Sequence, residues 1–469
     1  MHILIIGAGR IGRSVAENLV NESNDITIVD HDAERVNALE TRLDLRGVTG
    51  NALSPSVLES AGANDADMIL AVTANDETNM AVCLLASQLF NIPTRIARVR
   101  NQELRQYPRL LAEEGFQITS TIWPEQALNE SLLRLIEFPE ALQIIDFAGG
   151  KAVLFCVRAV AGSPLVGRPI GDLAVHLPYV PARIVSVFRR NRRLDISSET
   201  VIESGDEVIA LSSGRDVRRV ISELRQHEER IRRIMIAGNA RLGVQLAGLL
   251  NGPEGRRGYT ITILDEDTAL STSLAAAVPK DTELVTGSLT NEEVLTELCV
   301  DRCDLFISLS ARDENNIMGA LLAKKLGARR VIALTDSDTF SALMQGTQID
   351  VTVSSTQATI GELLRHVRRG DVLAAHSLRR GVAEALEIVA HGNKKSSRVV
   401  GKRIADIDLP EGVEIAALVR DTDDIEEPQV LIAQKDVIVE PEDRVIVFVP
   451  GKRVIAQVEK LFAVDVGFF

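Results

Sequence analysis

The stretch Gly7-Ala8-Gly9-Arg10-Ile11-Gly12 follows the apolar run Ile3–Ile6 and precedes a segment with helical spacing. A glycine turn between a strand and a helix, with an acid about 20 residues further on, is the dinucleotide-binding fingerprint. The acid here is Asp30, which ends the apolar run Ile26–Val29. This combination predicts a parallel, doubly wound sheet with a nucleotide site at its edge.

The same pattern occurs a second time. Gly238-Asn239-Ala240-Arg241-Leu242-Gly243 follows Ile234–Ala237, and Asp265 ends the next apolar run. Further pairs recur at one constant spacing: Asp67 and Asp304, Asp76 and Asp313, Asn79 and Asn316, Asp206 and Asp443. The chain therefore consists of two related halves.

A chain of 469 residues is too long for a single core. Each glycine-loop unit is followed by a smaller β-rich unit that lacks a phosphate loop. We predict an α/β protein with two doubly wound parallel-sheet (Rossmann-like) domains, each followed by a small α+β domain. The predicted domains are A1 (1–123), B1 (143–227), A2 (232–350) and B2 (368–453), and the charged segment Gln226–Arg233 is the predicted linker between the halves.

Within A1, apolar runs predict a series of short strands: Ile3–Ile6, Ile26–Asp30, Met68–Val72, Thr94–Val99 and Gln117–Thr119. The segment Gln126–Ile136 then has the spacing of an amphipathic helix. Its simplest interpretation is a connector packed on its own domain. The alternative is a hinge or dimer-contact helix.

The composition excludes several classes of function. A net charge of −14 disfavours nonspecific nucleic-acid binding, which needs a basic surface. No apolar run approaches the roughly 20 residues that span a bilayer. The four scattered cysteines fit a reducing compartment and form no zinc-binding pattern, so we expect no metal site and a cytoplasmic location.

In the first loop each glycine has a predicted task. Gly7 permits the tight turn, Gly9 lets the backbone approach a pyrophosphate, and Gly12 lets the helix pack on the strand. The helix N-terminus then presents N–H groups to the phosphates. The Asp30 carboxylate is placed to accept both hydroxyls of an adenosine ribose and would repel a 2′-phosphate. We therefore expect NAD(H) rather than NADP(H).

The carboxyl edge of the sheet offers further candidates. Thr73 and Ala74 follow the fourth strand, where ligands bind in such sheets. Arg98 ends the fifth strand and is either a cation for the phosphates or a surface charge. Three polar residues begin the next helix: Asp76, Glu77 and Asn79. We expect them to act first as N-terminal caps and as partners of the helix dipole, and second as ligand contacts.

The second loop departs from the fingerprint. Ala240 replaces the middle glycine, and equal spacing aligns Thr335 with Arg98, which removes a cation. Ser310 and Ala311 stand in for Thr73 and Ala74, while Asp265 keeps the ribose acid. The second site is weaker, differently tuned or empty.

No catalytic group accompanies either loop. The seven histidines are scattered, and neither small domain is large enough to hold a substrate beside a nicotinamide. Duplication of both modules suits a sensor better than an enzyme. The alternative is an NAD-dependent oxidoreductase with a duplicated cofactor domain, which NADH turnover would reveal.

On these residues the A domains resemble N-terminal domains, and the B domains C-terminal domains, of the RCK (KTN) family. The most distinctive stretches are Ile3–Gly12, Val48–Leu53, Leu58–Asp67, Thr73–Asn79, Val166–Leu173 and Gly205–Leu211. The resemblance implies a cytoplasmic regulatory subunit, peripheral on the inner membrane through a Trk-type potassium-transporting membrane protein. It also implies a homo-oligomer, expected to be a tetramer. From the net charge we expect no nucleic-acid partner.

The resemblance further implies a set of nucleotide-binding residues in each half. In A1 they are Gly7, Ala8, Gly9, Arg10, Ile11, Asp30, Thr73, Ala74 and Arg98; in A2 they are Gly238, Asn239, Ala240, Arg241, Leu242, Asp265, Ser310, Ala311 and Thr335. NAD(H) is the expected ligand, with ATP or ADP possible at the same or the second site. Binding would change the angle between paired A domains, and helices such as Gln126–Ile136 would transmit that change.

Overall fold

The computed structural model describes residues 1–20, 24–112, 114–226, 229–252, 258–344, 348–367, 372–378, 382–421 and 429–464. Outside these lie 253–257, inserted in the second half, residues 227–228 of the predicted linker, and the predicted start of B2 at 368–371. The chain divides into two compact units. The first comprises Met1–Pro124, Phe147–Ala152 and Thr356–Phe469, and the second Glu125–Asp146 and Val153–Ser355.

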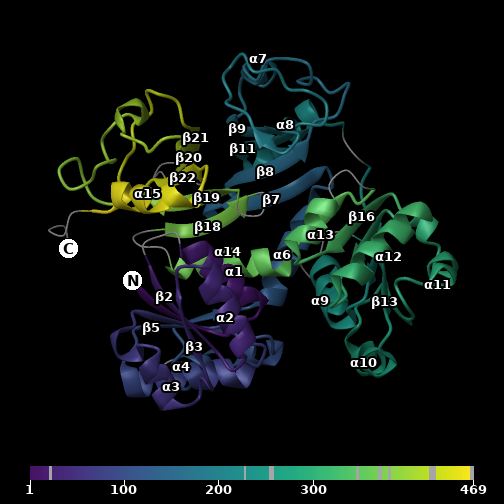
Figure 1. The fold of residues 1–469 in the computed structure, drawn as a ribbon. Helices are drawn as coiled ribbons and strands as arrows, with labels where there is room; N and C mark the ends of the chain where they lie inside the picture. Colours follow the sequence, from purple (N-terminus) through teal and green to yellow (C-terminus); the bar gives the residue numbers. More distant parts are fainter. Residues whose placement is uncertain are drawn as a thin grey trace. The chain divides into compact units, whose positions relative to one another are not determined.

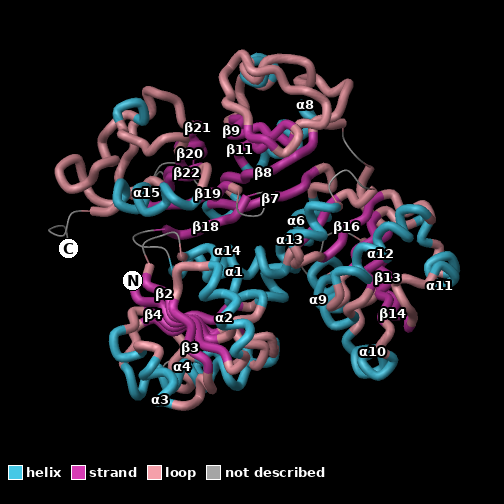
Figure 2. The backbone as a smooth tube through the Cα atoms, in the orientation of Figure 1, coloured by secondary structure: helices cyan, strands magenta, loops and turns pink. Residues whose placement is uncertain are grey.

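The first unit contains the parallel sheet of A1. Its strands are β1 (His2–Ile6), β2 (Asp25–Asp30), β3 (Arg46–Thr49), β4 (Met68–Ala71), β5 (Thr94–Arg98) and β6 (Ser120–Ile122), in the order β3-β2-β1-β4-β5-β6. Helices α1 (Arg10–Leu19), α2 (Ala33–Arg42), α3 (Pro55–Ser60), α4 (Asp76–Phe90) and α5 (Pro108–Leu111) belong to the same domain (Figure 2). The strand order reverses between β1 and β4, which places a ligand crevice at the carboxyl ends of these strands.

The second unit repeats this sheet in A2. Its strands are β12 (Arg233–Ala237), β13 (Thr260–Asp265), β14 (Thr282–Thr286), β15 (Leu305–Ser308), β16 (Arg330–Leu334) and β17 (Val351–Val353), in the order β14-β13-β12-β15-β16-β17. Helices α9 (Ala240–Asn251), α10 (Thr268–Leu274), α11 (Glu292–Glu297), α12 (Asp313–Lys325) and α13 (Asp338–Leu343) accompany it. The predicted pair of doubly wound sheets is confirmed.

Each small domain has an antiparallel sheet. In B1 it consists of β7 (Ala141–Phe147), β8 (Ala152–Arg158), β9 (Ala182–Arg189), β10 (Arg192–Arg193) and β11 (Glu207–Ser213), with helices α7 (Asp172–His176) and α8 (Val217–Leu224). In B2 it consists of β18 (Val372–Leu378), β19 (Ala383–Val389), β20 (Glu414–Arg420), β21 (Gln429–Ile432) and β22 (Arg444–Val449), with helix α15 (Ile455–Phe462). The predicted small α+β class is confirmed for both.

An ion pair between a partly exposed arginine and a buried aspartate recurs in the two small domains. Asp206 accepts from Arg189 Nε at 2.9 Å and from Nη2 at 2.8 Å, and Asp443 holds Arg420 in the same fork at 2.8 Å for both bonds. The carboxylates raise the pKa of both arginines above the usual range. The aspartate pair recognised in the sequence therefore fixes one strand end in each copy.

Two helices pack into the core of the other half of the sequence rather than the half that they follow. Helix α6 (Pro124–Glu137) follows β6 along the chain, yet Leu128, Leu132 and Leu135 are buried in the core of the A2 sheet with Ile234 and Ile236. Helix α14 (Ser355–Val367) follows β17, yet its apolar face joins the core of A1 and B2. In Figure 1 it lies between α1 and β18. The simplest interpretation of Gln126–Ile136, a connector packed on its own domain, is therefore wrong.

The sheet edges of A1 also differ from the prediction. The last strand is Ser120–Ile122 rather than Gln117–Thr119, and the edge strand Arg46–Thr49 had no apolar run to reveal it. Both strands are short and partly polar because each has a neighbour on one side only. Among the described residues, no helix is long and apolar enough to cross a membrane.

Candidate functional site

Two glycines of the first loop are required by the backbone around them. Gly7 has φ +106°, and a Cβ there would lie 3.1 Å from the backbone of Thr73. A Cβ on Gly12 would lie 1.8 Å from the carbonyl oxygen of Gly7. The loop can pass between β1 and α1 only with glycine at these two positions.

Gly9 is different because a Cβ there would meet no atom within 4 Å. The glycine is thus not demanded by the protein's own packing. Helix α1 begins at the next residue, Arg10, and no described side chain caps it. A backbone that stays open to approach, beside helix N–H groups that lack a side-chain acceptor, fits the phosphates of a dinucleotide.

Asp30 ends β2 and is only 8% exposed. Its Oδ2 accepts from the N–H of Ala8 at 2.6 Å, and its Oδ1 accepts from the N–H of Asp32 at 3.0 Å. His31 Nδ1 lies 3.1 Å from Oδ1. The carboxylate therefore orients the glycine loop, and its remaining lone pairs are the acceptors on which ribose hydroxyls could be bound.

Asn79 is fully buried and joins two strand ends. Its Oδ1 accepts from Thr73 N at 2.9 Å and from Thr73 Oγ1 at 2.7 Å, while its Nδ2 donates to the carbonyl of Arg98 at 2.8 Å. The predicted capping role of Asn79 is wrong, since Asn75 caps α4 by accepting from Thr78 N. Asn79 instead holds Thr73 and Arg98 at the same edge.

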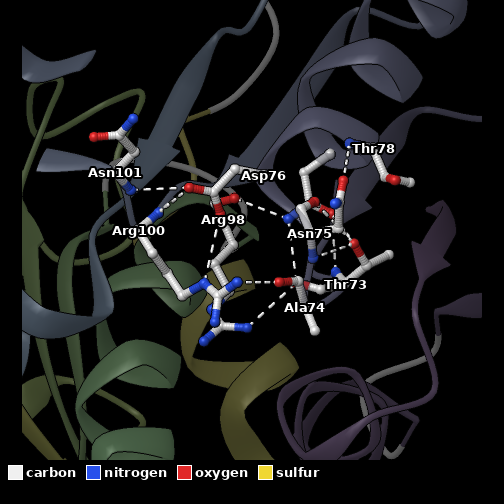
Figure 3. Close-up of polar contacts among 9 residues, drawn as sticks. Thr73, Ala74, Asn75, Asp76, Thr78, Arg98, Arg100 and Asn101 are labelled. Atoms are coloured by element: carbon white, nitrogen blue, oxygen red, sulfur yellow. Dashed lines mark hydrogen bonds and ion pairs between the residues drawn. The ribbon is translucent and has the colours of Figure 1, made fainter. Parts of the chain in front are cut away.

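Two arginines reach over this edge (Figure 3). Arg98 Nη1 donates to the carbonyl of Thr73 at 3.3 Å, and Arg100 Nη2 donates to the carbonyl of Ala74. Asp76 does not cap its helix either, because its Oδ2 accepts from Arg100 N at 2.8 Å and from Asn101 N at 2.9 Å. Arg100 was missed in the sequence because it lies beyond the strand, where no pattern distinguishes it from a surface charge.

The remaining candidates divide by exposure. Arg10 and Ala74 are exposed and Gly9 and Thr73 are partly exposed, whereas Ala8 and Ile11 are buried against the sheet. In the second copy Arg241 and Ala311 are exposed, Gly238, Asn239 and Ser310 are partly exposed, and Leu242 is buried. Ile11 and Leu242 thus offer backbone rather than side chain to the crevice.

In the second loop a side chain caps the helix that follows. Asn239 precedes α9 and caps it, since its Oδ1 accepts from the N–H of Leu242 at 3.0 Å. Ala240, fully buried, is the first residue of α9, and its N–H donates to Asp265 Oδ2 at 2.5 Å. The helix therefore begins one residue earlier than in the first copy and has a side-chain cap.

The predicted equivalence of Thr335 and Arg98, which was based on equal spacing, is wrong. Asn316, the counterpart of Asn79, donates to the carbonyl of Leu334 at 3.0 Å, as Asn79 does to Arg98. Leu334, not Thr335, therefore stands in the place of Arg98. The stretch from Ala323 to Gly327 is one residue shorter than that from Ala86 to Asn91, which shifts the alignment by one position.

Thr335 itself is fully buried, and its hydroxyl donates to Asp313 Oδ2 at 3.1 Å. The same carboxylate oxygen accepts from the N–H groups of Asp336 and Ser337, as Asp76 accepts from those of Arg100 and Asn101. Asp336 therefore stands where Arg100 stands. Both cations of the first edge are absent from the second, and one is replaced by an acid.

Comparison with protein families supports this division. The TrkA-N domain model matches residues 3–117 and 234–355, and the TrkA-C domain model matches residues 154–225 and 394–463. The two matches alternate along the chain in the order that the repeat predicted.

The chain is similar along its whole length to curated proteins named Trk system potassium uptake protein TrkA. It is 45% identical to that of Halomonas elongata over 469 residues, which is 100% of both chains. It is 42% identical to that of Vibrio alginolyticus over 98% of both chains, and 40% identical to that of Haemophilus influenzae over 98% of both.

Solved structures share the fold at low identity. The crystal structure of the GsuK RCK domain has a TM-score of 0.59 and 19% identity, and the match covers 98% of this chain and 95% of that one. The GsuK channel bound to NAD has a TM-score of 0.59 and 18% identity, with coverage of 98% and 79%. These structures confirm the RCK-type fold.

Proposed function

The chain belongs to the TrkA family of Trk system potassium uptake proteins, and on this basis we propose that it is a nucleotide-sensing regulatory subunit. In this proposal it controls potassium transport by a Trk-type membrane partner. It works as a homo-oligomer, expected to be a tetramer, held at the cytoplasmic face of the inner membrane by that partner. We propose four domains in the predicted order, with B1 beginning at Ala141, A2 extending to Val353 and B2 extending to Phe462.

The first glycine loop carries the nucleotide part of the proposal. The open position at Gly9 and the uncapped start of α1 suit a pyrophosphate, and Asp30 suits the adenosine ribose. Arg98, the last residue of β5, and Arg100, two residues later, add positive charge at this edge of the sheet. NAD(H) is the proposed ligand, and ATP or ADP would share the adenosine and phosphate contacts.

The second loop has a different proposed role. Its self-capped helix and the exchange of Arg100 for Asp336 make Gly238–Leu242 a weaker site, so A2 contributes mainly structure. Helix α6 supports the coupling step, since it follows the A1 sheet in the chain and is buried in the A2 core. A ligand that favours one arrangement of the domains would act through this helix.

The names of the relatives do not favour the alternative of an NAD-dependent oxidoreductase. The whole-length relatives are named as proteins of a potassium uptake system, and none of these names denotes an oxidoreductase. A sensor needs a nucleotide site and an element that connects it to another domain, and in this proposal the first glycine loop and helix α6 supply them.

A flux assay tests the proposal. Cells that lack the protein should lose Trk-type potassium uptake, and the Gly9→Val variant should restore little of it although it folds and assembles. The purified protein should leave NADH unoxidised, while NADH shifts its affinity for the membrane partner by about 1–3 kcal/mol. Full potassium uptake with Gly9→Val, or substrate-dependent NADH turnover, would contradict the proposal.

A further inference from the structure

The connection between β7 and β8 belongs to a different compact unit from most of B1. Residues Phe147–Ala152 are part of the first unit, whereas Glu125–Asp146 and Val153–Ser355 form the second. The chain therefore passes from the second unit into the first and back again within this short connection. Contacts that anchor the connection in the first unit act directly on a covalent link between the units.

Two side chains of B2 anchor the start of this connection. Phe147 is fully buried, and its ring meets that of His376 on β18 edge to face, with the ring centroids 5.4 Å apart. The N–H of Ala148 donates to Oε2 of Glu387 on β19 at 3.0 Å. Glu387 is only 4% exposed, so its carboxylate is shielded from water and makes a stronger hydrogen bond than an exposed one would.

The residues that follow the anchor are not closely packed. Ala148, Gly149 and Gly150 have φ of +49°, +65° and +86°, so three successive residues adopt left-handed backbone. A Cβ on either glycine would meet no atom within 4 Å, and Gly149 is exposed. An anchored residue is thus followed by two glycines that the surrounding side chains do not constrain, as at a hinge.

The fold of a small domain does not require the anchoring acid. By the backbone hydrogen bonds that the two halves share, Glu387 corresponds to Cys156. Its ion-pair partner Arg444, at 3.5 Å, corresponds to Glu207. The same strand therefore forms in B1 with a thiol in place of the carboxylate. Because burying a carboxylate is costly, Glu387 is there for its contacts rather than to fill the core.

Packed elements connect the A1 sheet with this anchor inside the first unit. Helix α14 lies in one hydrophobic core with A1 and B2. On this helix His366 Nδ1 lies 3.2 Å from the hydroxyl oxygen of Ser120, at the start of β6. The next strand after α14 is β18, which carries His376. A shift of the A1 sheet can therefore reach the anchor through contiguous contacts.

We propose that Glu387 is a latch that holds the β7–β8 connection on B2, and that Gly149 and Gly150 are the hinge on which the connection moves when the latch opens. The regulatory consequence rests on the proposed function. A nucleotide bound to A1 would change how firmly the latch is closed, and so act through the chain on β7 and β8. This route is additional to the one through α6.

Hydrogen exchange of the full-length protein, measured on the peptide that covers Phe147–Ala152, tests the latch without any ligand. Glu387→Ala removes the acceptor, whereas Glu387→Gln keeps an amide oxygen that can still accept from Ala148. The matched control is Glu411→Gln, which removes one carboxylate from an exposed position of B2. The amides of β22 report whether B2 stays folded.

Glu387→Ala should raise the exchange rate of this peptide at least about tenfold, and Glu387→Gln should raise it less. Glu411→Gln should not change it, and β22 should stay protected in all three variants. An unchanged exchange rate in Glu387→Ala would overturn the latch. A rise spread evenly over B2 in both Glu387 variants would also overturn it, since the acid would then only stabilise the domain.

Addition of NADH tests the regulatory consequence. NADH should change the exchange rate of the same peptide at least about twofold in the natural protein. Glu387→Ala should still bind NADH in calorimetry but lose this change. NADH binding without any change in the natural protein would overturn the coupling. Absence of NADH binding would instead contradict the proposed function, and the ligand-free comparison would still decide whether the latch exists.

Discussion

At the first glycine loop, α1 begins after Gly9 with no side-chain cap, whereas at the second loop α9 begins after Asn239, whose amide oxygen accepts from Leu242. Both loops keep the glycine turn and the acid at the end of the second strand. The two loops differ in whether a side chain accepts a hydrogen bond from the N–H groups at the start of the helix. The second loop therefore keeps the glycine turn of the fingerprint but adds a side-chain cap that the first loop lacks.

The carboxyl edges of the two parallel sheets also differ, in this case in their charged side chains. The first edge presents Arg98 and Arg100, and the second presents Leu334 and Asp336 at the same places. Asp336 also accepts from Ser354 and Ser355 at 2.8 Å, so it supports the start of α14. In the second copy this edge packs against the start of α14.

The largest expected effect comes from Gly9→Val. The side chain enters space that is empty in the protein, so the fold should survive while NADH affinity falls about 100-fold, or roughly 3 kcal/mol. Calorimetry with NADH measures the loss, and circular dichroism checks the fold.

The counterpart change is Ala240→Gly, which removes the methyl group but leaves the Asn239 cap in place. It should leave the tight NADH binding untouched. If Ala240→Gly abolished tight binding while Gly9→Val spared it, the ranking of the two loops would be inverted.

Asp30→Ala should cost about 1–3 kcal/mol of NADH binding, because ribose hydroxyls lose a charged acceptor and the loop loses its bond to Ala8 N. Asp30→Asn should cost less, since an amide oxygen can still accept. Asp265→Ala makes the same change in the second copy. Equal losses in the Asp30 and Asp265 variants would mean that both loops bind equally.

Neutralising the first edge with Arg98→Gln and Arg100→Gln should weaken NADH binding by about 1 kcal/mol in total. The effect is modest because partly exposed charges are screened by water and salt. The loss should shrink as ionic strength rises. A loss that does not change with salt would show that the arginines act through loop structure rather than charge.

The smallest expected effect is a pH dependence of stability that comes from a histidine in B2. Burial, together with the charge of Arg365, lowers the pKa of His376 to about 4, and the corresponding position of β7 is Ile145. The unfolded chain protonates first as pH falls, so stability should drop by about 0.5–1 kcal/mol between roughly pH 7 and 6. Urea unfolding of the natural protein and His376→Gln measures this; identical pH dependence in both would contradict it.

Much of this comparison could be predicted from the sequence. The glycine loops, Asp30 and Asp265 lie in strong local patterns, and Ala240 already indicated a degraded second loop. The alternation of large and small domains followed from the repeat itself. These features depend on short-range spacing, which a single sequence displays directly.

What sequence reasoning missed depends on tertiary context. A helix pattern indicates an apolar face but not its partner, so the burial of Leu132 in the A2 core was hidden. A one-residue difference near Gly327 broke the equal spacing and misassigned Thr335. The bridging role of Asn79 needed the positions of two strand ends, although its recurrence as Asn316 was a usable signal.

The central claim is that one loop of the two holds the nucleotide. The most direct measurement is an experimental structure of the full chain prepared with one molar equivalent of NADH. The account predicts NADH on Gly7–Ile11, with its adenosine ribose on Asp30 and no nucleotide on Gly238–Leu242. NADH on the second loop, or equal occupancy of both, would contradict it.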